Sequence, residues 1–212
     1  MLQPKFLTLI IILTGVVSCN KNEENPIVYQ STLSASDPSW YAGSGNGYTC
    51  GFNQGKYEVS LTSPGAYGYA LVPINGINFQ YSVSVDASTQ LSDASKAGYC
   101  GLFFNFVDLN NYMGFIVAPN GKFAIFEYSG GNYSMPVSWT QTNALKSGSG
   151  SINTIQLSQS ATSMKVMINN TVINTFPLSM LQNCAVGLYA QADTQNFTNM
   201  VGTFNNIVVK KL

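Results

Sequence analysis

Two of the chain's nine acidic residues, Asp108 and Glu127, lie in one short stretch, DLNNYMGFIVAPNGKFAIFEYSGG. A glycoside hydrolase uses such a pair as acid and base or nucleophile, with the carboxyl groups about 5 to 9.5 Å apart. Asp108 precedes two asparagines in a predicted turn, where Asp ordinarily bonds its own backbone. Glu127 falls on the face that we expect to be core. Both are therefore weak catalytic candidates, and structural roles are favoured.

The composition excludes several other chemistries. The sequence contains no His and no Arg, and charged residues make up 8% of it. Without imidazole there is no Ser-His-Asp triad and no His-bound metal. With no Arg and only scattered Lys, nucleic-acid binding is not expected. Ser, Thr, Asn, Gln, Gly and Tyr carry the polarity instead, which is typical of an all-β extracytoplasmic protein.

Calcium is the one metal for which ligands of the right type exist, because it takes carboxylate and carbonyl oxygens. Four aspartates lie at predicted strand ends or loops, and one or two could help to hold the ion: Asp86, Asp93, Asp108 and Asp193. No dense Asp-x-Asp-x-Asp loop is present, so we expect solvated loop acids and assign no metal site and no cofactor.

The N-terminus, MLQPKFLTLIIILTGVVSC, indicates a location. Lys5 precedes an apolar run, Phe6–Val17, that is too short to span a bilayer but suits a signal peptide. The run ends in VVSC, which resembles the lipobox of bacterial lipoproteins; this implies a signal peptide over 1–18 and lipidation (palmitate) of Cys19. An ordinary secretory signal or a membrane anchor is the alternative.

A polar tether is expected over 19–34. Its acidic pair, Glu23-Glu24, resembles the surface-export signal of Bacteroidetes lipoproteins. The implied location is the outer membrane, with the lipid as the membrane partner, and exposure at the cell surface is consistent with it. Three further cysteines, Cys50, Cys100 and Cys184, permit one disulfide in an oxidising compartment, but their spacing does not choose the pair. Buried apolar positions are the favoured role for them.

From about residue 57 onward the chain alternates between strand-like runs and turn clusters. The run NFQYSVSVDAS places Tyr81, Val83 and Val85 on one face and Ser82 and Ser84 on the other. We expect about ten to twelve strands in a single antiparallel β-sandwich over 35–212.

Several motifs follow one another in a familiar order: GLFF at 101–104, D-x-x-N-Y at 108–112, the P-N-G-K-F turn, SMKVMINNTVI, VGLYA and GTFNNIVV. Over roughly 35–212 the chain resembles the concanavalin A-like lectin/glucanase jelly roll, more closely the bacterial laminin G-like or 3-keto-disaccharide hydrolase-like domains. This fold carries lectins, enzymes and interaction modules alike. Two departures count against ion-dependent or catalytic roles: Asn205, not Asp, follows Phe204, and the paired-acid motif E-x-D-x-x-E is absent.

The sequence APNGK allows two hairpin turns. A two-residue Asn120-Gly121 turn would need positive φ at both residues. A type I turn with Gly121 as a left-handed bulge uses each residue where it is favoured, and we predict this one. Ala118 then lies opposite Lys122. The core face would carry Met113, Phe115, Val117, Phe123, Ile125 and Glu127; the other face would carry Tyr112, Gly114, Ile116, Ala118, Ala124, Phe126 and Tyr128.

The same alternation in neighbouring strands assigns Leu102, Phe104 and Phe106 to the core, and places Phe103 opposite. The resulting ligand-binding candidates on the non-core face are Tyr112, Phe126, Tyr128 and Tyr189 as a ring platform, with Asn105 and Gln191 as hydrogen-bonding partners. The alternative is that this face is the half-covered outside of a tyrosine-rich sheet. Trp40 and Trp139 could also stack on a ligand, although packing roles are expected for both.

The sequence thus predicts a lipid-anchored jelly roll that binds neutral carbohydrate. An enzyme is not the favoured interpretation; a glycoside-processing hydrolase acting through Glu127 or Asp108 is the rival, and a protein-interaction or structural module of the outer membrane is the third hypothesis. The oligomeric state is left open.

Overall fold

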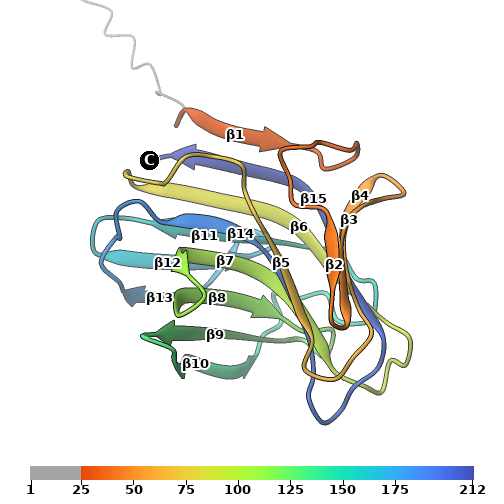
Figure 1. Cartoon of the computed structure of the whole chain (residues 1–212). Coiled ribbons are helices and arrows are strands. Elements are labelled where there is room, and N and C mark those ends of the chain that lie inside the picture. The colour runs from red at the N-terminus through yellow and green to blue at the C-terminus, as the bar shows by residue number, and fades with distance from the viewer. Residues whose placement is uncertain (1–24) are drawn as a thin grey trace, which may run out of the picture.

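Two antiparallel sheets pack face to face in the computed structural model, which describes residues 25–212 (Figure 1). The predicted signal peptide, the lipidation site Cys19 and the pair Glu23-Glu24 lie outside the described residues. In 25–212 there is no helix with the length and apolar character needed to cross a membrane. The prediction of an all-β sandwich is confirmed.

The described residues form fifteen strands, more than the sequence predicted, because several are short edge strands. Their bounds are β1 Ile27–Ser31, β2 Gly43–Gly45, β3 Tyr48–Asn53, β4 Lys56–Leu61, β5 Tyr67–Leu71, β6 Tyr81–Leu91, β7 Gly98–Asp108, β8 Asn111–Val117, β9 Lys122–Ser129, β10 Asn132–Gln141, β11 Asn153–Gln159, β12 Ser163–Ile168, β13 Thr171–Pro177, β14 Ala185–Ala192 and β15 Met200–Lys211.

The larger sheet has nine strands, ordered β13-β12-β11-β6-β15-β4-β3-β2, with β1 added alongside β15. The smaller sheet has six, ordered β10-β9-β8-β7-β14-β5. Figure 1 shows β1 beside the C-terminal strand. Ile27–Ser31, which falls within the predicted tether, pairs with β15, and the nearby Leu33 is fully buried, so the folded part begins before residue 35. Backbone pairing and apolar burial stabilise this segment despite its polar neighbours.

The main core lies between the sheets, and regular strands supply it with every second residue. In β11, for example, Ile155 and Leu157 are fully buried while Gln156 between them is half-buried. Trp40 packs in this core and its indole N–H donates to the Tyr29 hydroxyl at 2.7 Å, so its role is structural as predicted. The three described cysteines, Cys50, Cys100 and Cys184, are free thiols buried in the same core.

The β8–β9 hairpin adopts the predicted turn. Gly121 has φ of 83°, its N–H donates to the Ala118 carbonyl at 3.1 Å, and Asn120 has no positive φ. The Ala118 N–H donates to the Lys122 carbonyl at 2.9 Å, so these two residues lie opposite each other. This register decides the two faces of the hairpin. Met113, Phe115 and Val117 enter the main core, and Tyr112 and Ile116 point to the other side of the sheet.

One predicted face is wrong. Asn105 in β7 has φ of 49° and the pairing with β14 shifts register between Ala185 and Gly187, which marks a β-bulge. The extra residue reverses the alternation beyond it. Asn105 is buried with its side-chain oxygen 3.8 Å from the Cys184 sulfur in the main core, whereas Phe106, expected in the core, packs on the outer side of the smaller sheet.

Candidate functional site

The outer side of the smaller sheet carries a second apolar cluster, separate from the main core. We call it the aromatic face; its buried members are Phe103, Tyr112, Ile116, Ala124, Phe126 and Tyr189, with Tyr69, Tyr99, Phe106, Tyr128 and Met135 half-buried around them. All six strands of the smaller sheet, β10-β9-β8-β7-β14-β5, contribute at least one residue to it. The predicted platform therefore assembles where the hairpin register places it.

Phe103 lies at the centre of the aromatic face and is fully buried. Its ring stacks on Tyr189 at a centroid distance of 4.3 Å and lies 4.6 Å from Tyr112. The Phe126 ring lies over Gly114, where a Cβ would come within 2.2 Å of it. The space that small residues leave on the sheet is thus filled by the protein's own rings. Tyr112, Phe126 and Tyr189 each expose less than a tenth of their surface.

The remaining predicted ligand-binding residues divide in three ways. Tyr128 stacks on Tyr112 at 4.9 Å and is half-buried at the edge of the cluster. Gln191 accepts a short hydrogen bond from the Tyr189 hydroxyl, so its carbonyl is occupied within the face. Asn105 lies in the main core and is not part of this surface. Burial raises the pKa of Tyr112 and of Tyr189 well above the ordinary tyrosine value, so both hydroxyls stay protonated.

An open site lies at the border of the aromatic face, near the β8–β9 turn. A groove of about 340 Å³, here called the Trp139 groove, is lined by Tyr99, Trp139, Asn120, Lys122 and Asp193, among others. Trp139 is 37% exposed, and its ring meets Tyr99 edge to face at a centroid distance of 5.2 Å. The sequence predicts a packing role for Trp139 and does not single out Tyr99. Tyr99 lies four residues before Phe103 in the same strand and so faces the same side, a signal that identifies it from the sequence.

Trp139 reaches this position because β10 is irregular. Val137 packs against the main core, so regular alternation would bury Trp139 as well. The pairing of β10 with β9 shifts register between Val137 and Thr140, which turns the indole to the outer side. No feature of the sequence marks this shift.

Both signs of charge line the Trp139 groove. Lys96 and Lys122 supply ammonium groups and Asp193 a carboxylate. Asp193 accepts backbone N–H bonds from Gln195 at 2.9 Å and Asn196 at 2.7 Å, which fixes its position. Burial, with the nearby Asp193 charge adding to it, raises the pKa of Tyr99 to about 12. The Tyr99 hydroxyl therefore stays protonated at neutral pH and can donate a hydrogen bond.

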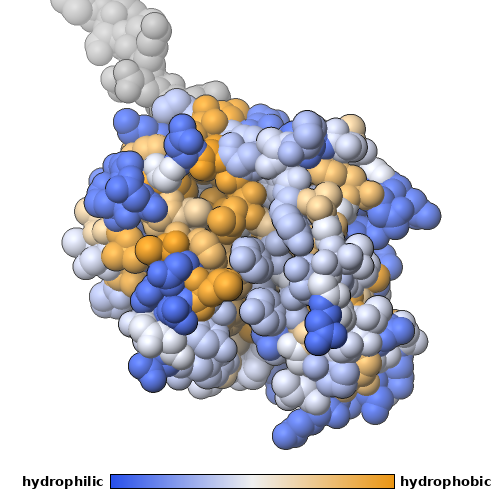
Figure 2. Space-filling model, in the orientation of Figure 1, coloured by the Kyte–Doolittle hydropathy of each residue, from blue (hydrophilic) through white to orange (hydrophobic). Residues whose placement is uncertain are grey.

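A larger groove of about 850 Å³ runs along β5 and faces residues of the β2–β3 region. Exposed apolar side chains, Val107 and Leu109, lie on and beside the β7–β8 turn, and Leu109 closes one end of this groove. In the view of Figure 2 the hydrophobic side chains gather to the left of β5, and the surface over β5 itself is paler. The lining contains no charged residue.

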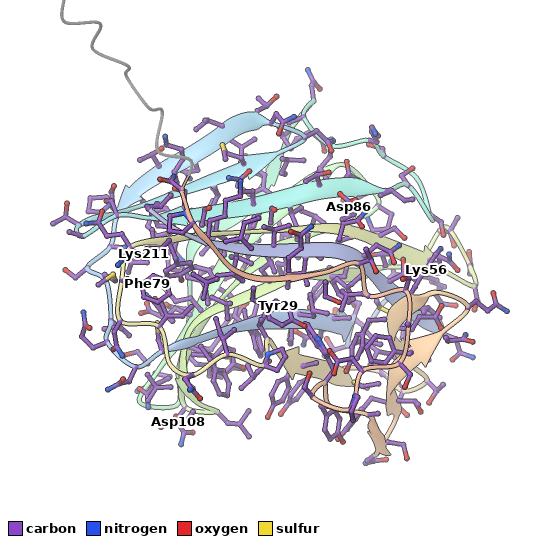
Figure 3. The ribbon with its side chains drawn as sticks, turned by 90° about the horizontal axis from the view of Figure 1, so that it is seen from above. Tyr29, Lys56, Phe79, Asp86, Asp108 and Lys211 are labelled. Atoms are coloured by element: carbon purple, nitrogen blue, oxygen red, sulfur yellow. The ribbon has the colours of Figure 1, made fainter. Side chains whose placement is uncertain are left out.

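The two candidate catalytic acids do not converge on either groove. Asp108 accepts the Asn110 N–H at 2.7 Å and the Asn111 side-chain amide at 3.0 Å, which closes the β7–β8 turn. Glu127 lies opposite Met113 on the core-side face and is half-buried, with the Ser134 hydroxyl 3.5 Å away. Figure 3 shows Asp108 at the periphery of the molecule. Their positions fit turn and rim roles.

The four aspartates considered for calcium are also separated. Asp93 and Asp193 accept hydrogen bonds from residues of their own loops. Asp86, on β6, accepts the Thr154 hydroxyl at 2.5 Å and the Asn206 amide at 2.8 Å. Figure 3 shows Asp86 well apart from Asp108. Among residues 25–212, no three His, Cys, Asp or Glu side chains gather as metal ligands would.

Comparison with known proteins supports the fold. No protein-family model matches the chain, and no curated protein matches it in sequence. Among solved structures, it is similar to the carbohydrate-binding module CBM66 from Bacillus subtilis, with a TM-score of 0.59 and 14% identity over 82% of this chain and 96% of that one.

Two further structures illustrate the range of the fold. The carbohydrate recognition domain of Emp47p gives a TM-score of 0.64 at 13% identity, covering 86% of this chain and 95% of that domain. A Bacillus licheniformis β-glucanase gives 0.61 at 12% identity, covering 87% and 98%. The chain therefore has the concanavalin A-like jelly-roll fold, which binding modules, lectin domains and glucanases share.

Proposed function

We propose that this protein binds neutral carbohydrate without cleaving it, and that the ligand lies in the Trp139 groove at the border of the aromatic face. The observation that carries the proposal is the exposed indole of Trp139, held against Tyr99 beside fixed polar groups. Sugars present apolar C–H faces and a ring of hydroxyls, which call for an aromatic surface and convergent hydrogen-bonding groups.

Each neighbouring group has a defined part in this recognition. Trp139 supplies the stacking surface and the Tyr99 hydroxyl donates a hydrogen bond. The Asp193 carboxylate accepts from sugar hydroxyls, and Asn120 and Lys122 supply donors. Asp193 offsets one of the two ammonium groups in the groove, so the neutral ligand class rests on the exposed indole and the hydroxyl-binding groups and not on the charge of the lining. The buried rings behind them, Phe103 among them, hold the sheet surface rigid rather than touch the ligand.

The test is a glycan array of neutral oligosaccharides followed by titration of any hit. Trp139→Ala should abolish the signal while leaving the circular dichroism spectrum unchanged. Tyr133→Ala is the matched control, because Tyr133 is an exposed ring of the same strand that does not line the groove. Equal loss in both variants, or no response across the array, would contradict the proposal.

We also propose that the domain acts at the outer membrane, anchored through lipid on Cys19. The support is the Val16–Cys19 motif. Wild-type protein should incorporate radiolabelled palmitate in its host, and Cys19→Ser should not. Equal labelling of the two would refute the anchor without bearing on carbohydrate binding.

A further inference from the structure

The Trp139 groove occupies one end of the sandwich, and the strands that lead away from it define the opposite end. β7 connects the two: it starts at Gly98 and Tyr99, which line the groove, and it ends at Asp108. The ten residue steps from Gly98 to Asp108, at about 3.4 Å each, separate the two ends by about 34 Å. We call the end away from the groove the β1 end, because β1 begins there.

Backbone hydrogen bonds bring the start of β1 to the end of β15 at this place. The Lys211 N–H donates to the carbonyl of Pro26, the residue before β1, at 3.0 Å. Ile27 pairs with Lys210, one residue earlier in β15. The N–H of Leu212 donates at 2.8 Å to the carbonyl of the residue before β6. In the larger sheet, the β1 end therefore contains the start of β1, the start of β6 and the end of β15.

The smaller sheet contributes its own loops to the β1 end. The Asn78 side-chain amide donates to the Asn183 side-chain oxygen at 2.9 Å, and the Asn183 N–H donates to the Asn78 side-chain oxygen at 2.7 Å. These bonds join the loop before β6 to the loop before β14. β14 in turn starts opposite Phe106, next to the β7–β8 turn. Figure 3 shows Phe79 and Asp108 on the same side of the molecule.

Exposed aliphatic side chains concentrate at the β1 end. Eight large aliphatic side chains are exposed in residues 25–212, and two of them, Ile152 and Val172, lie elsewhere. In Figure 2 the hydrophobic side chains gather on the side where Figure 1 marks the C-terminus. Apolar side chains gathered in this way mark an interaction surface, whereas single ones are ordinary. The six at the β1 end, each between 41% and 55% exposed, are Ile27, Val28, Val107, Leu109, Leu181 and Leu212.

The lipid anchor proposed above joins the folded domain at the same end. Ile27 follows Cys19 by eight residues, a stretch that spans at most about 29 Å when fully extended. That reach is shorter than the distance of about 34 Å between the two ends. A domain held by lipid on Cys19 therefore cannot stand on the bilayer with its Trp139 groove downward, whereas its β1 end can reach the lipid surface.

Charged side chains at the β1 end are compatible with a lipid surface. Lys210 and Lys211 are exposed, and the Lys211 ammonium lies 5.9 Å from the centre of the Phe79 ring. Asp108 offsets one of these two charges, so contact with lipid depends on the aliphatic side chains rather than on net charge. Aliphatic side chains enter the boundary between headgroups and acyl chains, while lysines reach the lipid phosphates.

We propose that the β1 end is a lipid-facing surface. Its aliphatic side chains enter the headgroup region of the bilayer that holds the anchor, and the Trp139 groove points away from that bilayer. The inference rests on the proposed lipid anchor and adds an orientation to it. A glycan outside the membrane then reaches the groove without meeting the bilayer.

The first experiment measures which end lies against lipid. The lipidated protein is reconstituted into vesicles of phosphatidylethanolamine and phosphatidylglycerol that contain a nitroxide-headgroup lipid. A fluorescent label is attached to Leu109→Cys at the β1 end, or to Ile152→Cys, a position of matched exposure (50% and 51%). Wild-type protein corrects for labelling of the other thiols. The nitroxide should quench the Leu109→Cys label at least threefold more; equal quenching, or stronger quenching at Ile152→Cys, would overturn the proposal.

The second experiment does not depend on the anchor, so failure of the two proposals can be told apart. Cys19→Ser protein, which carries no lipid, is mixed with an excess of the same vesicles and sedimented. Adding Val107→Ser, Leu109→Ser and Leu181→Ser together should reduce the bound fraction at least fivefold. These side chains are exposed, so thermal unfolding and carbohydrate binding should be unchanged.

The matched control adds Ile152→Ser and Val172→Ser to the Cys19→Ser protein and should change the bound fraction less than twofold. Equal loss in the control and the triple variant, or no vesicle binding by the Cys19→Ser protein, would overturn the proposal. A dimer that the triple variant dissociates would overturn it too, by assigning the β1 end to a second copy. If wild-type protein incorporates no palmitate but the vesicle results are as expected, the anchor is refuted and the lipid-facing surface stands.

Discussion

The aromatic face should behave as a second core, and replacing Phe103 tests this. Phe103 is fully buried and lies between the rings of Tyr189 and Tyr112. An aromatic side chain buries about 150 to 250 Å², which at about 25 cal/mol per Å² corresponds to about 4 to 6 kcal/mol. Alanine keeps part of that area, and measured Phe→Ala costs in cores are about 3 to 5 kcal/mol. We therefore expect Phe103→Ala to lower the free energy of unfolding by that amount.

Urea unfolding followed by tryptophan fluorescence measures the effect. With a slope of about 2 kcal/mol per molar urea, the midpoint should fall by about 1.5 to 2.5 M at unchanged slope. Tyr133→Ala is the control, since Tyr133 is 55% exposed and touches the cluster only at its border; it should cost about 1 kcal/mol. If both variants shift the midpoint equally, the aromatic face is a surface layer and the reasoning fails.

Four further outcomes follow from other positions in the fold. Gly101→Ala should greatly reduce the yield of folded protein, because its Cβ would lie 1.9 Å from the Phe115 carbonyl oxygen; normal thermal unfolding would contradict this. Burial raises the pKa of Cys50 to about 11 and of Cys100 to about 12, so both thiols should resist a disulfide reagent at pH 8 until urea is added. Because these pKa values are raised on folding, their contribution to stability is complete below about pH 9, the ordinary thiol value, and should be lost as pH rises through 11 to 12, as thermal scans against pH would record. Asp108→Ala should lower stability by about 1 kcal/mol through loss of the turn bonds, with carbohydrate binding unchanged; loss of that binding would show that Asp108 does more than close its turn.

Sequence reasoning succeeded where the structure is decided by local geometry. The Pro119-Asn120-Gly121 turn fixes the register of its hairpin, and the register fixes which residues face the core. That logic placed Phe115 inside and Tyr112 outside. The buried tryptophan, Trp40, was also expected, because packing is the usual fate of that residue type.

Sequence reasoning failed where a single residue interrupts a regular pattern or where side chains compete for one space. The bulge at Asn105 and the irregularity before Thr140 each reverse a face, and neither alters composition or spacing. Whether Gly114 leaves room for a ligand depends on where the Phe126 ring goes, which only tertiary packing decides. Trp139, in the open part of the site, could not be located from alternation alone, because the register shift in β10 turns its side chain to the outer side.

The bulge at Asn105 adds one residue to β7 and so reverses which residues face outward in the rest of the strand. Before it, odd-numbered residues of β7 face outward, and after it Phe106 does, so Phe103 and Phe106 stack nearly parallel on one surface. Deleting Asn105 would shorten the strand by one residue and would also turn the residues after it, Phe106 first, from the outer face toward the main core. Alignments and redesigns of this domain must therefore treat β7 as two segments, before and after Asn105, whose alternation of buried and outward-facing residues is opposite.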